Sequence, residues 1–174
     1  DAFNRWEAAQ RLYQSAMLKA YAGIDNRDLL TVLESVLNKA LQDSKLDNAF
    51  KAMLLAAPGY GILADAVGKD LKPQALYAAR EAVLGALARA LKPQCKALYN
   101  AMPKAPQYSP DAAQAGQRSL RNAVLGLWLR SGDVAALKAA QVQYKTANNM
   151  TDRMGALGST LHGHPSAAQP MLAD

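Results

Sequence analysis

The chain has 174 residues, with 20 Lys and Arg against 14 Asp and Glu, so its formal net charge is +6. Apolar residues make up 51% of the chain and aromatic residues only 6%, and Ala and Leu together supply about a third of it, a composition that argues against any sizeable sheet or disordered tail. We therefore expect one all-α domain over residues 1–174, long enough to bury a core. Composition alone says nothing about its function.

Apolar residues recur with helical spacing along the whole chain. The first helix is expected over residues 3–22, with Asn4 as its N-cap, Glu7 completing a capping box, and Gly23 ending it with positive φ. The other helices are expected at residues 28–41, 47–57, 73–91, 95–102, 111–130, 134–147 and 151–161, with one weak turn or two at 62–67 and the start of a helix at 165.

The connections between these helices predict the topology. Pro93 is expected to break the long helix before it, and residues 103–110, with three prolines, form the clearest loop. Most other connections are short, which makes successive helices antiparallel neighbours. A series of such hairpins predicts a right-handed α-solenoid of the armadillo or HEAT kind, and the absence of a strict period leaves a compact bundle as the alternative.

The charge is uneven along the chain. Residues 1–81 hold ten acidic and ten basic side chains, whereas residues 82–174 hold four and ten. A basic half is typical of proteins that bind nucleic acid or an anionic membrane. Here the bases are scattered, without a run or regular aromatic interleaving, so we interpret them as solvated helix faces. We expect no nucleic-acid partner and no membrane contact.

No catalytic or metal motif is present. A zinc site needs three or four converging His, Cys or carboxylate ligands, and the two histidines, His162 and His164, lie in a segment of loop-like composition. Cys95 has lysines nearby that could lower a thiol pKa, but a small buried helix residue is the better interpretation. Glu81 beside Arg80 is expected to form an exposed pair. We predict that this chain binds no metal or cofactor and is not itself a catalyst.

The location in the cell is inferred from cysteine usage and from the first residues. One cysteine excludes an internal disulfide and fits a reducing compartment, so we expect a cytoplasmic protein. No signal peptide opens the chain, and no apolar stretch approaches the length of a membrane helix. Because helical pattern starts almost at Asp1, we expect a piece of a longer polypeptide.

Separate segments resemble one family. Residues 4–10, Asn-Arg-Trp-Glu-Ala-Ala-Gln, are similar to the signature that opens the C-terminal helical domain of bacterial aminopeptidase N. The segments 118–122, Arg-Ser-Leu-Arg-Asn, and 147–152, Ala-Asn-Asn-Met-Thr-Asp, resemble two further segments of that domain in the same order. Tyr99-Asn100-Ala101 lies between them, where the family has a similar tripeptide.

The resemblance implies a function for the protein that contains this chain. Members of the family are zinc-dependent aminopeptidases that remove N-terminal residues from peptides. Their catalytic motifs are absent here, so no catalytic, cofactor or metal-ligating residue transfers to this chain. The resemblance implies a non-catalytic domain that packs on the catalytic domain of the same polypeptide, covers its cavity and restricts access for peptides. The alternative is a free-standing helical-repeat module that contacts an acidic partner or nucleic acid through its basic half.

The resembling segments also have structural interpretations. Trp6 lies on the apolar stripe of the first helix and is expected to pack in the core. Asn148 and Asn149 suit a left-handed helix end, and Thr151 suits the N-cap of the next helix. Arg118 and Arg121 share a helix face, where they meet carboxylates of a neighbouring helix or line a channel or interface.

Overall fold

The computed structural model describes residues 2–102 and 104–173, and within these ranges all regular structure is helical. The helices are α1 (Ala2–Tyr21), α2 (Arg27–Gln42), α3 (Asn48–Leu55), α4 (Tyr60–Val67), the 3₁₀ turn η1 (Gly68–Asp70), α5 (Pro73–Ala90), α6 (Lys92–Ala101), α7 (Ala112–Arg130), α8 (Val134–Thr146), α9 (Met150–Gly163) and α10 (Pro165–Leu172). The predicted all-α class is confirmed.

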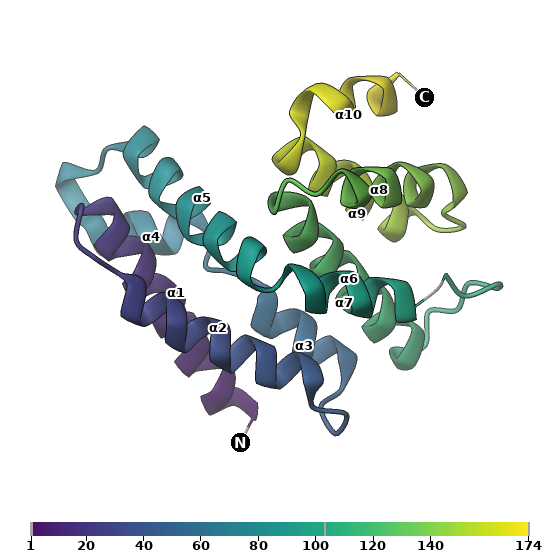
Figure 1. Cartoon of the computed structure of the whole chain (residues 1–174), viewed down its shortest axis with the longest axis horizontal. Coiled ribbons are helices and arrows are strands. Elements are labelled where there is room, and N and C mark those ends of the chain that lie inside the picture. The colour runs from purple at the N-terminus through teal and green to yellow at the C-terminus, as the bar shows by residue number, and fades with distance from the viewer. Residues whose placement is uncertain (1, 103, 174) are drawn as a thin grey trace.

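The helices form an extended array from one end of the molecule to the other (Figure 1). At the N-terminal end, α1 and α2 form a hairpin, and α5 packs across both. At the other end, α8 and α9 pack side by side and α10 covers α9. This stacking of helical units is the predicted solenoid, and the alternative of a compact bundle does not hold.

Helix α7 connects the two ends of the array. It packs against α3, α5 and α6 on the N-terminal side and against α8 and α9 on the C-terminal side. The crossing with α3 is close, because a Cβ built on Gly116 would lie 3.3 Å from the backbone nitrogen of Ala49. One continuous apolar core therefore runs through the array, from Ala9 on α1 to Met171 on α10.

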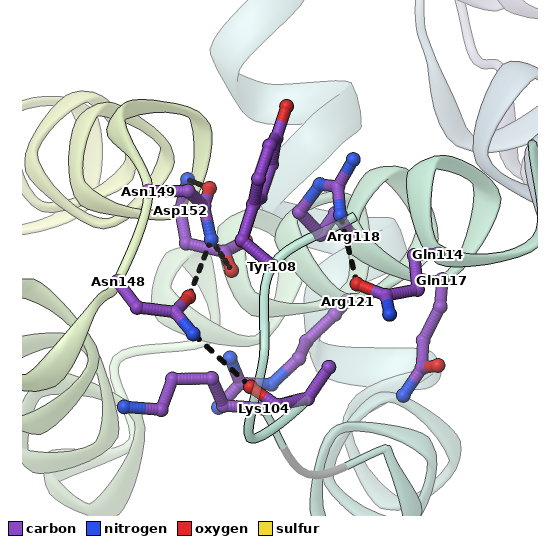
Figure 2. A pocket seen from close by; sticks show the side chains of 10 residues that line it. Lys104, Tyr108, Gln114, Gln117, Arg118, Arg121, Asn148, Asn149 and Asp152 are labelled. Atoms are coloured by element: carbon purple, nitrogen blue, oxygen red, sulfur yellow. Dashed lines mark hydrogen bonds between the residues drawn. The ribbon is translucent and has the colours of Figure 1, made fainter. Parts of the chain in front are cut away.

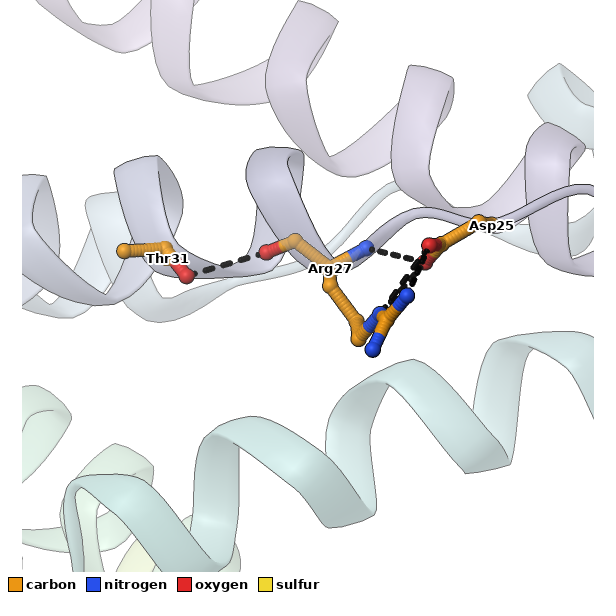
Figure 3. Close-up of polar contacts among 3 residues, drawn as sticks. All are labelled: Asp25, Arg27 and Thr31. Atoms are coloured by element: carbon orange, nitrogen blue, oxygen red, sulfur yellow. Dashed lines mark hydrogen bonds and ion pairs between the residues drawn. The ribbon is translucent and has the colours of Figure 1, made fainter.

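Helix α2 begins with a charged turn rather than with a side-chain cap (Figure 3). The Asp25 carboxylate accepts hydrogen bonds from the Arg27 guanidinium at 2.6–3.0 Å and from the Arg27 backbone N–H at 3.0 Å. These bonds, the side-chain ones first, lower the pKa of Asp25 to about 2. Asn26 instead donates its Nδ2 to the carbonyl of Ala16, which joins the start of α2 to α1.

Most expected boundaries agree with the structure to within a residue or two. Gly23 has φ +69°, as expected for a residue that ends α1. The helix is interrupted at Leu91, between α5 and α6 and close to Pro93, as expected. The loop expected at 103–110 is confirmed from Lys104 onward, whereas Pro103 lies outside the described residues.

The expected capping box at the start of the first helix is wrong. Asn4 is not an N-cap, because α1 already begins at Ala2 and Asn4 lies inside it. Glu7 therefore has no capping role and pairs with Arg11 one turn later, at 2.7 Å. The segment expected to form one weak turn or two at 62–67 is the two-turn helix α4, whose buried Leu63 anchors it against the core.

Arg80 and Glu81 form the predicted pair, but the expectation that this pair is exposed is wrong. Both side chains are mostly buried, with 16% and 22% of their surface exposed. Glu81 on α5 accepts from Arg80 at 3.3 Å and also pairs with Arg130 at the end of α7. Arg80 donates its Nε to the carbonyl of Pro58, so this cluster joins α5, α7 and the segment before α4.

No single helix in the described part of the chain is long and apolar enough to cross a membrane. Among the described helices, one pair is long and apolar enough when its members are taken together: α3 and the segment of α4 and η1. The two members of this pair are bent by 41° relative to each other.

Candidate functional site

Three of the family-like segments, far apart in sequence, meet in one place. Tyr99 comes from α6, Arg118 and Arg121 from α7, and Asn148 to Asp152 from the start of α9. Around them lies a polar recess (Figure 2). Its walls are Lys104, Ala105 and Tyr108 of the loop, Gln114, Gln117, Arg118 and Arg121 of α7, and Asn148, Asn149 and Asp152.

The polar recess is small. The space inside it that is open to the centre of a water molecule is about 20 Å³, which is room for one or two ordered waters rather than for a peptide side chain. Lys104, Tyr108 and Asn148 are exposed at its rim, whereas Asp152 is buried. The recess therefore suits one small polar group.

Asp152 is the buried carboxylate of the polar recess, with 2% of its surface exposed. Its Oδ1 accepts from Asn122 Nδ2 at 3.1 Å, and its Oδ2 accepts from Asn149 Nδ2 at 2.9 Å. A buried carboxylate is costly unless it is hydrogen-bonded in this way. Asp152 thus holds α9 against α7 through amide side chains.

The hydrogen bonds continue from Asp152 into the core between α6 and α8. Gln143, also buried, donates its Nε2 to Asn122 Oδ1 at 2.7 Å and to the carbonyl of Asp152 at 2.9 Å. Its Oε1 accepts from the Tyr99 hydroxyl at 3.0 Å. Burial raises the pKa of Tyr99, Arg121 lowers it in part and Asp152 raises it further, so the hydroxyl stays protonated and able to donate. This buried network joins α6, α7, α8 and α9.

The two arginines of the polar recess stack on aromatic rings. The Arg118 guanidinium lies 4.8 Å from the centre of the Tyr108 ring, and that of Arg121 lies 4.6 Å from the centre of the Tyr99 ring. Within the described residues, neither arginine lies at ion-pair distance from a carboxylate. Both arginines therefore lie at the wall of a recess. Of the two roles expected for them, pairing with carboxylates is replaced by stacking on aromatic rings.

The loop over the polar recess is held by side chains from α7 and from the α8–α9 turn. Arg118 Nη1 donates to the carbonyl of Ser109 at 2.9 Å, and Asn148 Nδ2 donates to that of Ala105 at 3.2 Å. Lys104 Nζ donates to the carbonyl of Thr146 at 2.5 Å. The position of the loop therefore depends on the same residues that form the recess.

The expected roles of Asn148, Asn149 and Thr151 were wrong. No non-glycine residue in the described ranges has positive φ, so neither asparagine is left-handed. Asn149 is the N-cap of α9, in extended conformation, and its Oδ1 accepts from the Asp152 N–H at 2.9 Å. The pattern Asn-x-x-Asp at 149–152 is itself a capping-box signal. Thr151 is exposed in the first turn of α9.

Beside the network, the Asn122 side chain of α7 lies directly against the backbone of Gly155 on α9. A Cβ built on Gly155 would lie 2.7 Å from both Cγ and Oδ1 of Asn122, closer than a side chain can pack. A glycine at this position therefore lets Asn122 reach Asp152 and Gln143.

The other predicted positions lie away from the polar recess. Cys95 is fully buried on α6, as expected, and burial raises its pKa to about 12. Trp6 is partly buried against the core and contacts the ring of Phe3. His162 belongs to the last turn of α9 rather than to a loop, and His164 separates α9 from α10.

Metal ligands do not converge in the part of the chain that the structure describes, since no three His, Cys, Asp or Glu side chains lie together. The residues present therefore do not fit a zinc site, which needs three or four such ligands.

The recess itself could not be predicted from the sequence. Its wall comes from a loop without periodicity and from helices that are adjacent only in the fold, and the spacing of Arg118 and Arg121 indicated no more than a shared face. The resemblance was the better signal, because its segments contain Tyr99, Asn122, Asn149 and Asp152.

Comparison with known proteins gives one consistent answer. Residues 1–174 match the family described as "Domain of unknown function (DUF3458_C) ARM repeats". Aminopeptidase N of Caulobacter vibrioides is 35% identical over 157 residues, which cover 90% of this chain and 18% of that protein. Aminopeptidase N of Escherichia coli K12 is 29% identical over 162 residues, covering 91% and 18%.

A solved structure has the same fold. The crystal structure of Legionella pneumophila aminopeptidase A in complex with aspartic acid superposes with a TM-score of 0.81 at 23% identity, covering 100% of this chain and 21% of that one. The chain thus spans about a fifth of the length of the relatives it matches.

Proposed function

Since the chain belongs to the family of ARM-repeat domains described as a domain of unknown function (DUF3458_C), we propose that it is the non-catalytic C-terminal helical domain of a zinc-dependent aminopeptidase. One observation carries the proposal: nearly the whole chain aligns with a small part of two aminopeptidases N. The missing group of metal ligands in the described residues supports a non-catalytic role. Zinc and the residues that hold it then belong to the catalytic domain of the same polypeptide.

The domain's task, in this proposal, is to cover the catalytic cavity and to restrict which peptides enter it. A cover excludes water and selects by size, while the chemistry occurs elsewhere in the enzyme. The rigid array around α7 suits that task, because its core is continuous from α1 to α10. We place the enzyme in the cytoplasm, which the single buried cysteine supports.

The covering role is tested in the complete aminopeptidase that contains residues 1–174. Three samples are compared: the intact enzyme, the enzyme lacking these residues, and the shortened enzyme mixed with the purified 174-residue chain. Each is assayed with alanine p-nitroanilide and with peptides of increasing length that begin with alanine. The shortened enzyme should keep its zinc and cleave the small substrate but lose its preference for short peptides. The added chain should restore that preference.

An unchanged length preference in a shortened enzyme that still holds zinc would refute the covering role. The purified chain alone gives a second test, since it should bind no stoichiometric zinc after dialysis and release no p-nitroaniline. One tightly bound zinc per chain would contradict the non-catalytic assignment.

The basic half is not expected to bind nucleic acid. Four of its cations, Lys96, Arg118, Arg121 and Arg153, already stack on aromatic rings of the domain, and Arg130 pairs with Glu81. Strong phosphate binding needs several free bases in one patch and falls steeply with salt. Fluorescence anisotropy with labelled duplex and single strands at physiological salt should therefore detect no submicromolar binding, and such binding would favour the free-standing module.

A further inference from the structure

Arg121, at the wall of the polar recess, has one nitrogen that the fold leaves without an acceptor. The Arg121 guanidinium stacks on the Tyr99 ring and donates one Nη2 hydrogen bond to the Tyr99 hydroxyl, at 3.1 Å. Its Nε is buried and has no hydrogen-bond partner among the described residues. A buried charged donor without an acceptor is unfavourable, and such a group commonly marks an ordered water or ion.

The charges around this donor favour an anion. Lys104, Arg118 and Arg121 line the polar recess, against the single carboxylate of Asp152. The two oxygens of that carboxylate are used by the amides of Asn122 and Asn149. The remaining excess of positive charge lies in a partly closed site, where electrostatic interactions are stronger than in water.

The size of the polar recess limits the anion. A volume of about 20 Å³ has room for one atom or one carboxylate oxygen near the size of water. A phosphate or sulfate would need the loop at 104–110 to move, and that loop is tied by Arg118 to Ser109 and by Asn148 to Ala105. In Figure 2, the Arg121 side chain extends under this loop toward the side where Lys104 and Asn148 lie.

We propose that the polar recess binds one small monovalent anion, a halide or a carboxylate no larger than formate, with Arg121 as its main donor. The bound anion neutralises part of the local charge and completes the contacts between α7, α9 and the loop at 104–110. Binding is weak, because Asp152 is close by and the rim is open to solvent. This site does not depend on the proposed function, and its test requires no enzymatic activity.

The test measures the stability of the 174-residue chain as chloride replaces gluconate at constant ionic strength. Gluconate is too large for the polar recess, so the denaturation midpoint should rise with chloride and saturate. The variant Arg121→Gln should lose this rise. Arg153→Gln is the matched control, because Arg153 stacks on Tyr144 at 4.7 Å in the same manner but lies outside the recess. It should respond to chloride as the unchanged chain does.

A second series with formate in place of chloride distinguishes the source of the anion. A saturable response to both anions, or to either one alone, supports the site and identifies whether halide or carboxylate is preferred. No response to either, or an equal response in Arg121→Gln, would overturn it. Chloride-35 line widths in the unchanged chain give an independent measurement if the variant does not fold. Native protein should broaden the chloride resonance and excess bromide should relieve the broadening, and the absence of such broadening would overturn a halide site.

Discussion

The first five helices and the last five are held together by different kinds of polar contact. Among α1 to α5, two buried polar side chains bind backbone carbonyls: Tyr13 reaches Leu55 at 3.4 Å, and Lys51 reaches Leu41 at 3.3 Å. The mostly buried pair of Arg80 and Glu81 differs, because Glu81 also pairs with Arg130 of α7. Among α6 to α9, side chains bind one another, in the network of Tyr99, Gln143, Asn122, Asp152 and Asn149. The apolar core is continuous across both regions.

The difference affects how each region responds to substitution. A side chain that binds a backbone carbonyl depends on one partner, and that partner is present whatever residue supplies it. In a buried side-chain network, the loss of one member leaves several others unsatisfied, and the cost exceeds that of a single bond. We therefore expect the C-terminal region to tolerate fewer substitutions.

The largest expected effect concerns the boundary between the regions. Cys95 is buried on α6. The pKa of Tyr13 on α1 is raised by burial first and by the nearby Cys95 second. Burial raises the pKa of Cys95 to about 12, so at mildly alkaline pH its thiolate is about a thousandfold scarcer than that of a free cysteine with a pKa of about 8.5. Labelling with a thiol reagent should be slow in the native chain and complete in denaturant.

The chain's single cysteine makes this measurement unambiguous. Labelling of the native chain as fast as that of the unfolded chain would mean that the two regions separate readily at this boundary.

The second-largest effect is expected from a substitution that breaks the side-chain network. Asp152→Ala removes the buried carboxylate that accepts from both Asn122 and Asn149 and should lower the free energy of unfolding by about 3 kcal/mol, because two partly buried amide donors lose a charged partner. The control is Asp65→Ala, at an exposed carboxylate on α4, with an expected change within about 0.5 kcal/mol. Urea denaturation of both variants decides the matter, and equal small changes would show that the network contributes little.

Gly155→Ala tests the same network by placing a methyl group where the Asn122 side chain now lies. The new Cβ would lie 2.7 Å from Asn122, so α9 must shift or Asn122 must leave its partners, at a cost of about 2 kcal/mol. Gly158→Ala is the control, because a Cβ on Gly158 meets no atom within 4 Å. Thermal unfolding should show a clear loss for Gly155→Ala and a neutral or raised midpoint for Gly158→Ala.

The smallest effects compare helix caps in the two regions. Asp47 caps α3 by accepting from the Phe50 N–H at 2.8 Å, and Asp47→Ala should cost about 1 kcal/mol. Asn149 caps α9 and also donates to Asp152, so Asn149→Ala should cost about twice as much. Thr151→Ala should change stability by less than about 0.5 kcal/mol. A larger loss for Thr151 than for Asn149 would mean that α9 begins two residues later than the structure has it.

Helix positions were largely predictable, and contacts between distant segments were not. Apolar spacing located the helices from α1 to α9 because burial of one face imposes it directly on the sequence. The contact of Arg130 with the pair of Arg80 and Glu81 was missed, since Arg130 reaches Glu81 only after α5 packs on α7. The cap at Asn149 was missed for another reason: its local signal was present, but a left-handed turn was preferred to it.

The crossing of α3 and α7 has a consequence for synthesis on the ribosome. In an ideal repeat array each unit packs only on its neighbours, so the growing chain can complete its core step by step. Here α3 finds its main partner only after α4, α5 and α6 have been made. Until α7 leaves the exit tunnel, α3 is covered only by α1 and α2 and its side that faces α7 stays exposed, and transiently exposed apolar surface promotes aggregation. The nascent N-terminal region should therefore depend on chaperones over that interval.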